Sequence, residues 1–571
     1  MTQFANKGVV LADVQPLLDG AVPPHRVTHS APDRIEWALD EGRTITLAVG
    51  EEGDALRFDI SVCGLGDAPL SLGLRFGAVR GVQRYLRNGY HSWDGSFFAD
   101  PGTPAGDAPP GKEPTLGFAM TALVPRAAPG AVMLGFDRHD RFQNRFRFGG
   151  NAEAMTIDVE TLLDRTGATT AEPLYLYADD DVEAALIRWS ERVAAASPFT
   201  PRIPAKRISG WCSWYNLYAA IDEANVREHL DAAAAYRDAH GTRLDIFLID
   251  DGFTPEMGDW LDVKPQFPSG MAPLLGEIAG AGFTPGLWIA PFMVGNRSRL
   301  FAEHPDWVVR ERATGEPLIQ MAFYGEFRWH KRSEEYYVLD ITHPGAEAWI
   351  RQVFRTWAQD WGARYFKTDF MFFGAEYGPD RALWHEAGQS RIAIWRKMAA
   401  VVREEIGDAL WLGCGCPLWA SVGLVDAVRI GRDVGVKWSG DQSAESLLRD
   451  QATRNHAAGR LWQADPDCIL LRDRYHDLSD AQVRSLALLA GLSGGVLMTS
   501  DTLDTLSADR AALFDRIAAL DIGSCRYPTL GNGEAMIVQR ATLVDGSTLE
   551  LRLDPATGES RCVDGQGKVW P

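Results

Sequence analysis

The first 200 residues of the 571-residue chain alternate apolar and polar positions in short runs. RTITLAVGEEGD and ALRFDISVCG are typical, and turn residues separate such runs at intervals of roughly 8 to 12 residues. Successive side chains of a strand point to opposite faces, so this pattern predicts strands with one buried face. A helical period first appears in DDVEAALIRWSERVAAAS at 180–197. We therefore expect an antiparallel β-sandwich domain over residues 1–200.

A different pattern begins after the Pro-rich linker PFTPRIPAKR at 198–207, where apolar runs alternate with helical segments. The eight expected strands lie in RISGWCSW (207–214), LDIFLIDDGF (244–253), TPGLWIAPF (284–292), ARYFKTDFMF (363–372), LWLGCGCP (410–417), DAVRIGRDV (426–434), CILL (468–471) and GGVLMTS (494–500). Eight strands separated by helices predict a (β/α)8 TIM barrel over residues 201–520, with its active site at the carboxyl ends of the strands. Residues 293–362 are too many for one helix, so we expect an excursion after the third strand.

The last segment returns to β character. AMIVQRATLVDGSTLELRLDP contains an Asp-Gly pair between two apolar runs, which indicates a hairpin. We therefore expect a small antiparallel β domain over residues 521–571. The predicted fold class is α/β: a TIM barrel with an N-terminal β-sandwich and a small C-terminal β domain.

Charge and composition exclude several classes of function. The formal net charge is −20 and is spread along the chain, which argues against nucleic-acid or anionic-membrane partners. No run approaches the roughly 20 apolar residues of a membrane span, and the N-terminus lacks the pattern of a signal peptide. Seven scattered cysteines do not suit a disulfide framework, so we expect a cytoplasmic protein. Nothing in the pattern indicates an oligomeric state.

The fourth expected strand, YFKTDF at 365–370, carries Lys367 and Asp369 on one face of an otherwise apolar run. The second strand ends in Asp250-Asp251, and the sixth carries Arg429 and Asp433. Each group has a structural alternative, because an Asp-Asp-Gly turn can cap a helix and the two cation–carboxylate sets can be buried ion pairs. Buried pairs contribute little net stability, so two of them at one rim favour a functional role.

Several carboxylates at a barrel mouth suit two chemistries. One is a Mg²⁺ site, and the other is glycoside hydrolysis by a carboxylate pair. Lys367 and Arg429 place positive charge where a divalent ion would have to lie, which favours hydrolysis without a metal or other cofactor. Cys414 and Cys416 form a Cys-x-Cys pair, but a soft-metal site needs a second Cys or His pair that the neighbouring sequence lacks.

The ordered motifs WCSWYNLY, LIDDGF, GLWIAPF, YFKTDF, LGCGCPL, VRIGRDVG and PDCILLR resemble those of the α-galactosidases (melibiases) of glycoside hydrolase family 36. RNGYHSWDG, in the first domain, resembles the family's loop that lends an aromatic residue to the active site. The resemblance implies a retaining exo-α-galactosidase, which releases terminal galactose from oligosaccharides such as melibiose or raffinose by double displacement.

By this resemblance, Asp369 is the nucleophile and Asp433 the acid/base. The implied substrate-binding residues are Asp250, Asp251, Trp288, Lys367, Cys414, Arg429 and Trp93. Asp250 and Asp251 would accept from the axial 4-hydroxyl and the 6-hydroxyl of galactose. Lys367 is also expected to favour the charged form of Asp369, because an opposite charge stabilises a carboxylate.

Arg432 and Val434, beside the expected acid/base, depart from the smaller or neutral residues expected there and leave the preferred leaving group open. Two related activities remain as alternatives, galactosyl transfer and α-N-acetylgalactosaminidase activity. A non-catalytic barrel that binds α-galactosides is the alternative of a different class.

Overall fold

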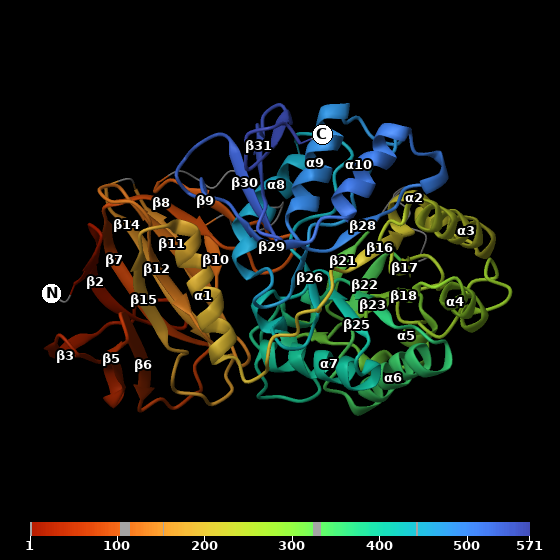
Figure 1. The fold of residues 1–571 in the computed structure, drawn as a ribbon. Helices are drawn as coiled ribbons and strands as arrows, with labels where there is room; N and C mark the ends of the chain where they lie inside the picture. The colour runs from red at the N-terminus through yellow and green to blue at the C-terminus, as the bar shows by residue number, and fades with distance from the viewer. Residues whose placement is uncertain (1–2, 103–114, 152, 324–332, 441–442, 571) are drawn as a thin grey trace.

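The computed structural model describes the whole chain except residues 1–2, 103–114, 152, 324–332, 441–442 and 571. Figure 1 shows antiparallel sheets built by the first part of the chain on one side and a parallel barrel on the other. A smaller sheet from the end of the chain lies beside the barrel helices α9 (Asp480–Leu492) and α10 (Ala508–Ala518). The expected fold class is confirmed. The domain boundaries at residues 200 and 520 stay a prediction.

The N-terminal region contains two antiparallel sheets. The six-stranded sheet has the order β1-β2-β7-β14-β13-β10, with β1 (Phe4–Asn6), β2 (Val9–Leu18), β7 (Ser71–Arg80), β14 (Met155–Leu162), β13 (Gln143–Gly150) and β10 (Leu116–Phe118). The nine-stranded sheet has the order β3-β4-β5-β6-β15-β12-β11-β8-β9, with β3 (Arg26–Ala31), β4 (Arg34–Ala38), β5 (Thr44–Glu52), β6 (Ala55–Cys63), β15 (Leu174–Asp179), β12 (Ala131–Phe136), β11 (Met120–Pro125), β8 (Val82–Arg87) and β9 (Phe97–Ala99).

Apolar side chains from both sheets form one core. Leu74 and Ile157 of the first sheet pack in the same cluster as Phe58 and Leu134 of the second, and all four are buried. The alternation read from the sequence therefore places one face of each sheet inward. Helix α1 (Val182–Ala196) follows the last strand and covers the nine-stranded sheet, where the indole of Trp189 donates to the carbonyl of Phe136 at 2.9 Å.

The barrel sheet has eight parallel strands. Their order is β27-β26-β25-β23-β18-β17-β16-β28, with β27 (Gln463–Asp465), β26 (Ala427–Arg429), β25 (Leu410–Gly413), β23 (Tyr365–Thr368), β18 (Thr284–Ile289), β17 (Ile246–Ile249), β16 (Ser209–Cys212) and β28 (Leu497–Thr499). A single parallel bridge between Ile469 and Thr499 links the two ends of the sheet. Helices between most neighbouring strands cover the outside of the barrel, and inward side chains fill its interior, so both faces are buried and the strands read as nearly continuous apolar runs.

The seventh strand differs from the prediction. It spans Gln463–Asp465 rather than 468–471, because the chain turns at Pro466 and Asp467. Asp467 has a left-handed backbone with φ +80°, and its side chain accepts from the backbone N–H of Cys468 at 2.7 Å. CILL follows the strand end instead of forming it, so Asp465 and Asp467 lie at the carboxyl end of the barrel.

The remaining barrel helices are α2 (Trp214–Leu217), α3 (Glu223–His240), α4 (Met271–Gly280), α5 (Arg299–Glu303), α6 (Pro344–Arg355), α7 (Arg391–Ile406) and α8 (Ala444–Arg454). The expected excursion after the third strand is present. It contains α5, a three-stranded sheet of β19 (Met293–Gly295), β22 (Glu335–Val338) and β21 (Ile319–Ala322), and the strand β20 (Arg310–Glu311), which pairs with β24 (Ala382–Leu383).

The C-terminal sheet consists of β29 (Ile522–Arg526), β30 (Ile537–Leu543), β31 (Thr548–Leu553) and β32 (Ser560–Asp564). The predicted hairpin joins β30 to β31, and Gly546 takes φ +84° in its turn. This sheet packs against α9. Within the described residues, no helix combines the length and apolar character that crossing a bilayer requires.

Candidate active site

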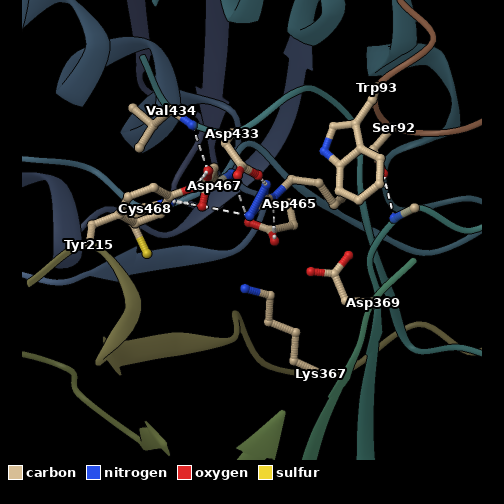
Figure 2. A network of polar contacts seen from close by, with 12 residues as sticks. Ser92, Trp93, Tyr215, Lys367, Asp369, Asp433, Val434, Asp465, Asp467 and Cys468 are labelled. Atoms are coloured by element: carbon tan, nitrogen blue, oxygen red, sulfur yellow. Dashed lines mark hydrogen bonds and ion pairs between the residues drawn. The ribbon is translucent and has the colours of Figure 1, made fainter. Parts of the chain in front are cut away.

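Parallel strands carry the predicted site residues to one end of the barrel. Asp250 follows β17, Asp369 follows β23, and Asp433 lies in the segment after β26. Lys367 stands within β23, and Arg429 is the last residue of β26. The side chains of Lys367 and Asp369 border the same space as the cluster that contains Asp433 (Figure 2).

Lys367 pairs with Asp250, which was not its expected partner. Its Nζ lies 2.8 Å from Oδ2 of Asp250, and both side chains are buried. The Cys212 thiol donates to the same oxygen at 3.4 Å, and the side chain of Ser213 accepts from the Asp250 backbone N–H at 2.8 Å. Asp251 is also buried. A fixed cation–carboxylate pair therefore forms one wall of the mouth.

Asp369 has a different environment. Its Oδ2 accepts from the indole of Trp288 at 3.2 Å, and its Oδ1 accepts from the backbone N–H of Phe370 at 2.8 Å. Burial raises the pKa of the Asp369 carboxyl, Lys367 lowers it and the charge of Asp433 raises it, for a net upward shift. The predicted influence of Lys367 has the expected sign, but it is outweighed. Cys414 is buried, and its thiol also lowers the pKa of Asp369 through a hydrogen bond.

Asp433 is the exposed carboxylate of the mouth. Its side chain is 55% accessible, while that of its partner Arg429 is 2% accessible. The Nη1 of Arg429 lies 3.0 Å from Oδ1 of Asp433. The same guanidinium also reaches Asp465 at 3.4 Å and Asp467 at 2.8 Å. A buried arginine thus connects the exposed carboxylate to two buried ones.

Trp93, which the family resemblance implies for the site, comes from the N-terminal sheet region. It lies in the loop between β8 and β9, and its ring centroid is 5.1 Å from that of Phe370. The hydroxyl of Ser92 accepts from the backbone N–H of Gly415 at 2.7 Å, and the ring of His91 stacks on that of Phe372 at 4.6 Å. These contacts fix the loop across the carboxyl end of the barrel (Figure 2).

The sequence reading did not identify Asp465, Asp467 and Tyr215 as parts of the site. Burial raises the pKa of Asp467 to about 6, and the hydroxyl of Tyr215 donates to its Oδ2. The signal was the ADPD sequence at 464–467, which covers the carboxyl end of the seventh strand and the turn after it. With a strand predicted at 468–471, Asp465 and Asp467 would precede its amino end, far from the expected site.

Across the described part of the chain, His, Cys, Asp and Glu side chains form no group of three or more arranged to hold a metal ion. Cys416 lies in the Cys-x-Cys segment as a buried thiol. The charged groups of the mouth are instead engaged with one another and with backbone donors.

A (β/α)8 barrel with an inner and an exposed aspartate at the carboxyl ends of its strands offers the carboxylate pair that the class of glycoside hydrolases uses. Comparison with known proteins narrows this class. Residues 212–384 match the Melibiase family model. The expected resemblance to the α-galactosidases of glycoside hydrolase family 36 is thereby confirmed for this part of the barrel.

Curated relatives support the same resemblance over a short segment. Alpha-galactosidase 2 of Pediococcus pentosaceus is 30% identical over 105 residues, which is 17% of this chain and 14% of that protein. The alpha-galactosidase of Escherichia coli is 26% identical over 112 residues, 18% of this chain and 15% of that protein. The matched segments thus span about a seventh of these relatives.

Solved structures extend the similarity of fold to nearly the whole chain. TtGalA, the α-galactosidase from Thermus thermophilus, in complex with p-nitrophenyl α-D-galactopyranoside, gives a TM-score of 0.67 at 24% identity over 91% of this chain and 98% of that chain. The same enzyme with stachyose gives 0.65 at 24% identity over 87% and 99%. The family 36 α-galactosidase AgaA from Geobacillus stearothermophilus gives 0.58 at 12% identity over 95% and 79%.

Proposed function

We propose that this chain is a retaining exo-α-galactosidase that hydrolyses terminal α-linked galactose from oligosaccharides such as melibiose or raffinose. The observation that carries the proposal is the contrast between Asp369 and Asp433. The charge of Asp433 raises the pKa of Asp369, yet Asp369 is held inside the mouth by Trp288 and Asp433 is exposed at its rim. Two carboxylates in unlike environments suit the two roles of glycoside hydrolysis.

In this proposal Asp369 attacks the anomeric carbon and forms a glycosyl-enzyme intermediate. Asp433 protonates the departing oxygen, and then takes a proton from the water that releases galactose. Exposure suits Asp433, because the leaving group and the water both approach from solvent. The indole of Trp288 and the backbone N–H of Phe370 orient the attacking carboxylate.

The remaining residues would recognise the sugar. Asp250 and Asp251 are buried acceptors for the 4- and 6-hydroxyls, and Lys367 is a donor fixed by Asp250. Arg429 would face the 2-hydroxyl side. Trp93, Trp288 and Cys414 would complete the wall of the pocket, with Trp93 supplied by the N-terminal loop.

The test is turnover of p-nitrophenyl α-galactoside, with proton NMR of the first sugar released. We expect α-galactose as the initial product and no turnover with Asp369→Ala. Initial release of β-galactose would rule out double displacement. Binding of galactose without turnover would identify a non-catalytic barrel, and preference for the aryl α-N-acetylgalactosaminide would reassign the substrate. Formation of galactosyl oligosaccharides in place of free galactose would indicate a transferase.

We also propose that the protein works in the cytoplasm. All seven cysteines are free thiols, which suits a reducing compartment. Intact disulfides after purification under non-reducing conditions, measured by thiol titration, would contradict this location.

A further inference from the structure

The carboxylate of Asp467, just past the end of β27, accepts from four donors. Its Oδ1 lies 2.8 Å from Nη2 of Arg429 and 2.7 Å from the backbone nitrogen of Cys468. Its Oδ2 accepts from the hydroxyl of Tyr215, and from the backbone N–H of Val434 at 2.7 Å. Each oxygen thus has two donors, which matches the acceptor capacity of a carboxylate.

These donors come from three separate parts of the barrel mouth. Tyr215 lies in α2 after the first strand, Arg429 ends the sixth strand, and Val434 follows the exposed Asp433. Asp467 itself is 4% exposed. Because all four of its donors are protein groups, its oxygens are occupied by the protein, and Figure 2 shows it next to Asp433. This geometry suits a residue that holds others in place, and it does not suit a proton donor to substrate.

The local backbone also indicates a specialised role. Asp467 has φ +80°, a conformation that side chains other than glycine rarely adopt. Asp465 stabilises this turn, because its Oδ1 accepts from the Asp467 N–H at 2.9 Å. Strained residues persist where the surroundings over-determine them, which is common at functional sites.

We propose that Asp467 is a positioning residue for the acid/base Asp433, holding it through two separate connections. The first is the hydrogen bond to the backbone of Val434, the residue next to Asp433. The second is Arg429, whose guanidinium bridges the carboxylates of Asp467 and Asp433 at 2.8 and 3.0 Å. The inference rests on the proposed function, because it assigns Asp467 to the proton-transfer half of that reaction.

Asp467→Asn tests the proposal. An asparagine amide has one accepting oxygen, so it cannot satisfy all four donors. Asp426→Asn is the matched control, since Asp426 is also buried and accepts from Arg202 at 3.0 Å, Arg403 at 2.6 Å and the backbone of Trp411 at 2.9 Å. Asp426 precedes β26 and therefore lies at the opposite end of the barrel.

The measurement compares kcat/KM on two substrates. Melibiose has a poor leaving group, glucose, which needs a proton to depart, whereas 2,4-dinitrophenyl α-galactoside releases a phenolate that needs none. General acid catalysis contributes about 10²- to 10⁴-fold, so a displaced acid should cost about 10- to 100-fold on melibiose and less than about threefold on the dinitrophenyl substrate. Azide should raise the kcat of Asp467→Asn on the dinitrophenyl substrate, because it attacks the intermediate without a general base. Asp426→Asn should lower the melting temperature and leave the ratio of the kcat/KM values on the two substrates unchanged.

Equal losses on both substrates, with no effect of azide, would overturn the proposal and leave Asp467 with a structural role like that of Asp426. If Asp467→Asn does not fold, Tyr215→Phe replaces it, because it removes one donor to Asp467 and leaves Val434 and Arg429 in place. This variant should lose about threefold or more on melibiose alone. An equal loss of kcat/KM on both substrates would overturn the proposal in the same way. Absence of wild-type turnover would instead refute the proposed function itself, before any variant is compared.

Discussion

The two ends of strand β26 show two uses of buried charge. At the amino end, Asp426 is 5% exposed and is matched by Arg202 and Arg403. At the carboxyl end, Arg429 is equally buried, but one of its partners, Asp433, has a side chain that is 55% accessible. The same strand therefore begins beside a buried carboxylate and ends beside one that is exposed.

The difference shows where a barrel can support chemistry. A carboxylate enclosed by two guanidinium groups and a backbone N–H has its interactions completed by the protein, so its removal destabilises the fold by leaving those groups unpaired. A carboxylate that shares a buried arginine and still meets solvent can also meet a ligand. Perturbed and partly exposed carboxylates gather at the carboxyl end, where the predicted site residues lie. Substitutions at the carboxyl end should therefore change turnover, and substitutions at the amino end should change stability.

The largest effect is expected for the nucleophile. Asp369→Ala should lower kcat/KM by at least about 10⁴-fold on every α-galactoside, because no covalent intermediate can form. Asp433→Ala should approach this loss only on substrates with poor leaving groups. Azide should raise its kcat on the dinitrophenyl substrate. Steady-state kinetics on dinitrophenyl and methyl α-galactosides measure both variants. Equal sensitivity of the two variants to the leaving group would remove the distinction between their roles.

The second effect tests the amino end. Asp426→Ala leaves Arg202 and Arg403 without a buried partner and should reduce the free energy of unfolding by about 3 kcal/mol. Urea denaturation measures this change. The kcat of the folded fraction should stay within about twofold of wild type, since residues at this end of a barrel serve stability. Loss of kcat without loss of stability would erase the contrast between the two ends.

The third effect concerns selectivity. Asp250 and Asp251 are buried, and glucose, whose 4-hydroxyl is equatorial, would leave one of these acceptors unpaired. The wild type should prefer aryl α-galactosides to α-glucosides by about 100-fold or more in kcat/KM. Asp250→Asn and Asp251→Asn should each narrow this ratio, chiefly by harming the galactoside reaction. Melting temperatures recorded alongside reveal whether the Asp-Asp-Gly turn has only a structural role: both variants would then lose stability and keep the wild-type ratio.

The smallest effect concerns acid stability away from the mouth. His456 is buried beside the rings of Trp189 and Trp419, and burial lowers its pKa to about 3. An unfolded histidine binds a proton near pH 6.5, so stability is complete above that pH and falls as the pH drops toward 3. At pH 5 this residue should account for a loss of about 2 kcal/mol. Because His456 lies away from the mouth, this loss of stability is an acid effect on folding and is distinct from any acid effect on turnover.

His456→Gln should flatten the fall of the melting temperature between pH 7 and 5, even if it lowers the melting temperature at neutral pH. His25→Gln is the control, because His25 is exposed in the N-terminal region. An unchanged slope in His456→Gln would show that another group governs acid unfolding.

The sequence by itself determined most of the fold and the residue types of the site. Alternation predicted the antiparallel sheets, and the apolar runs located seven of the eight barrel strands, because side-chain periodicity is a local property of the chain. The motifs also placed Asp250, Asp369 and Asp433 at or after strand ends. The seventh strand was misplaced because CILL is as apolar as a buried strand, while the turn at Asp467 depends on the contacts of its side chain.

Only the tertiary structure decided which charges meet. Lys367 pairs with Asp250, 117 positions away in the chain, rather than acting mainly on its neighbour Asp369. The hydrogen bond between Tyr215 and Asp467 spans 252 positions, and that between Ser92 and Gly415 spans 323. Periodicity indicates which face of a strand a side chain occupies. The closure of the barrel determines what lies opposite that face, because it joins strands that the sequence keeps far apart.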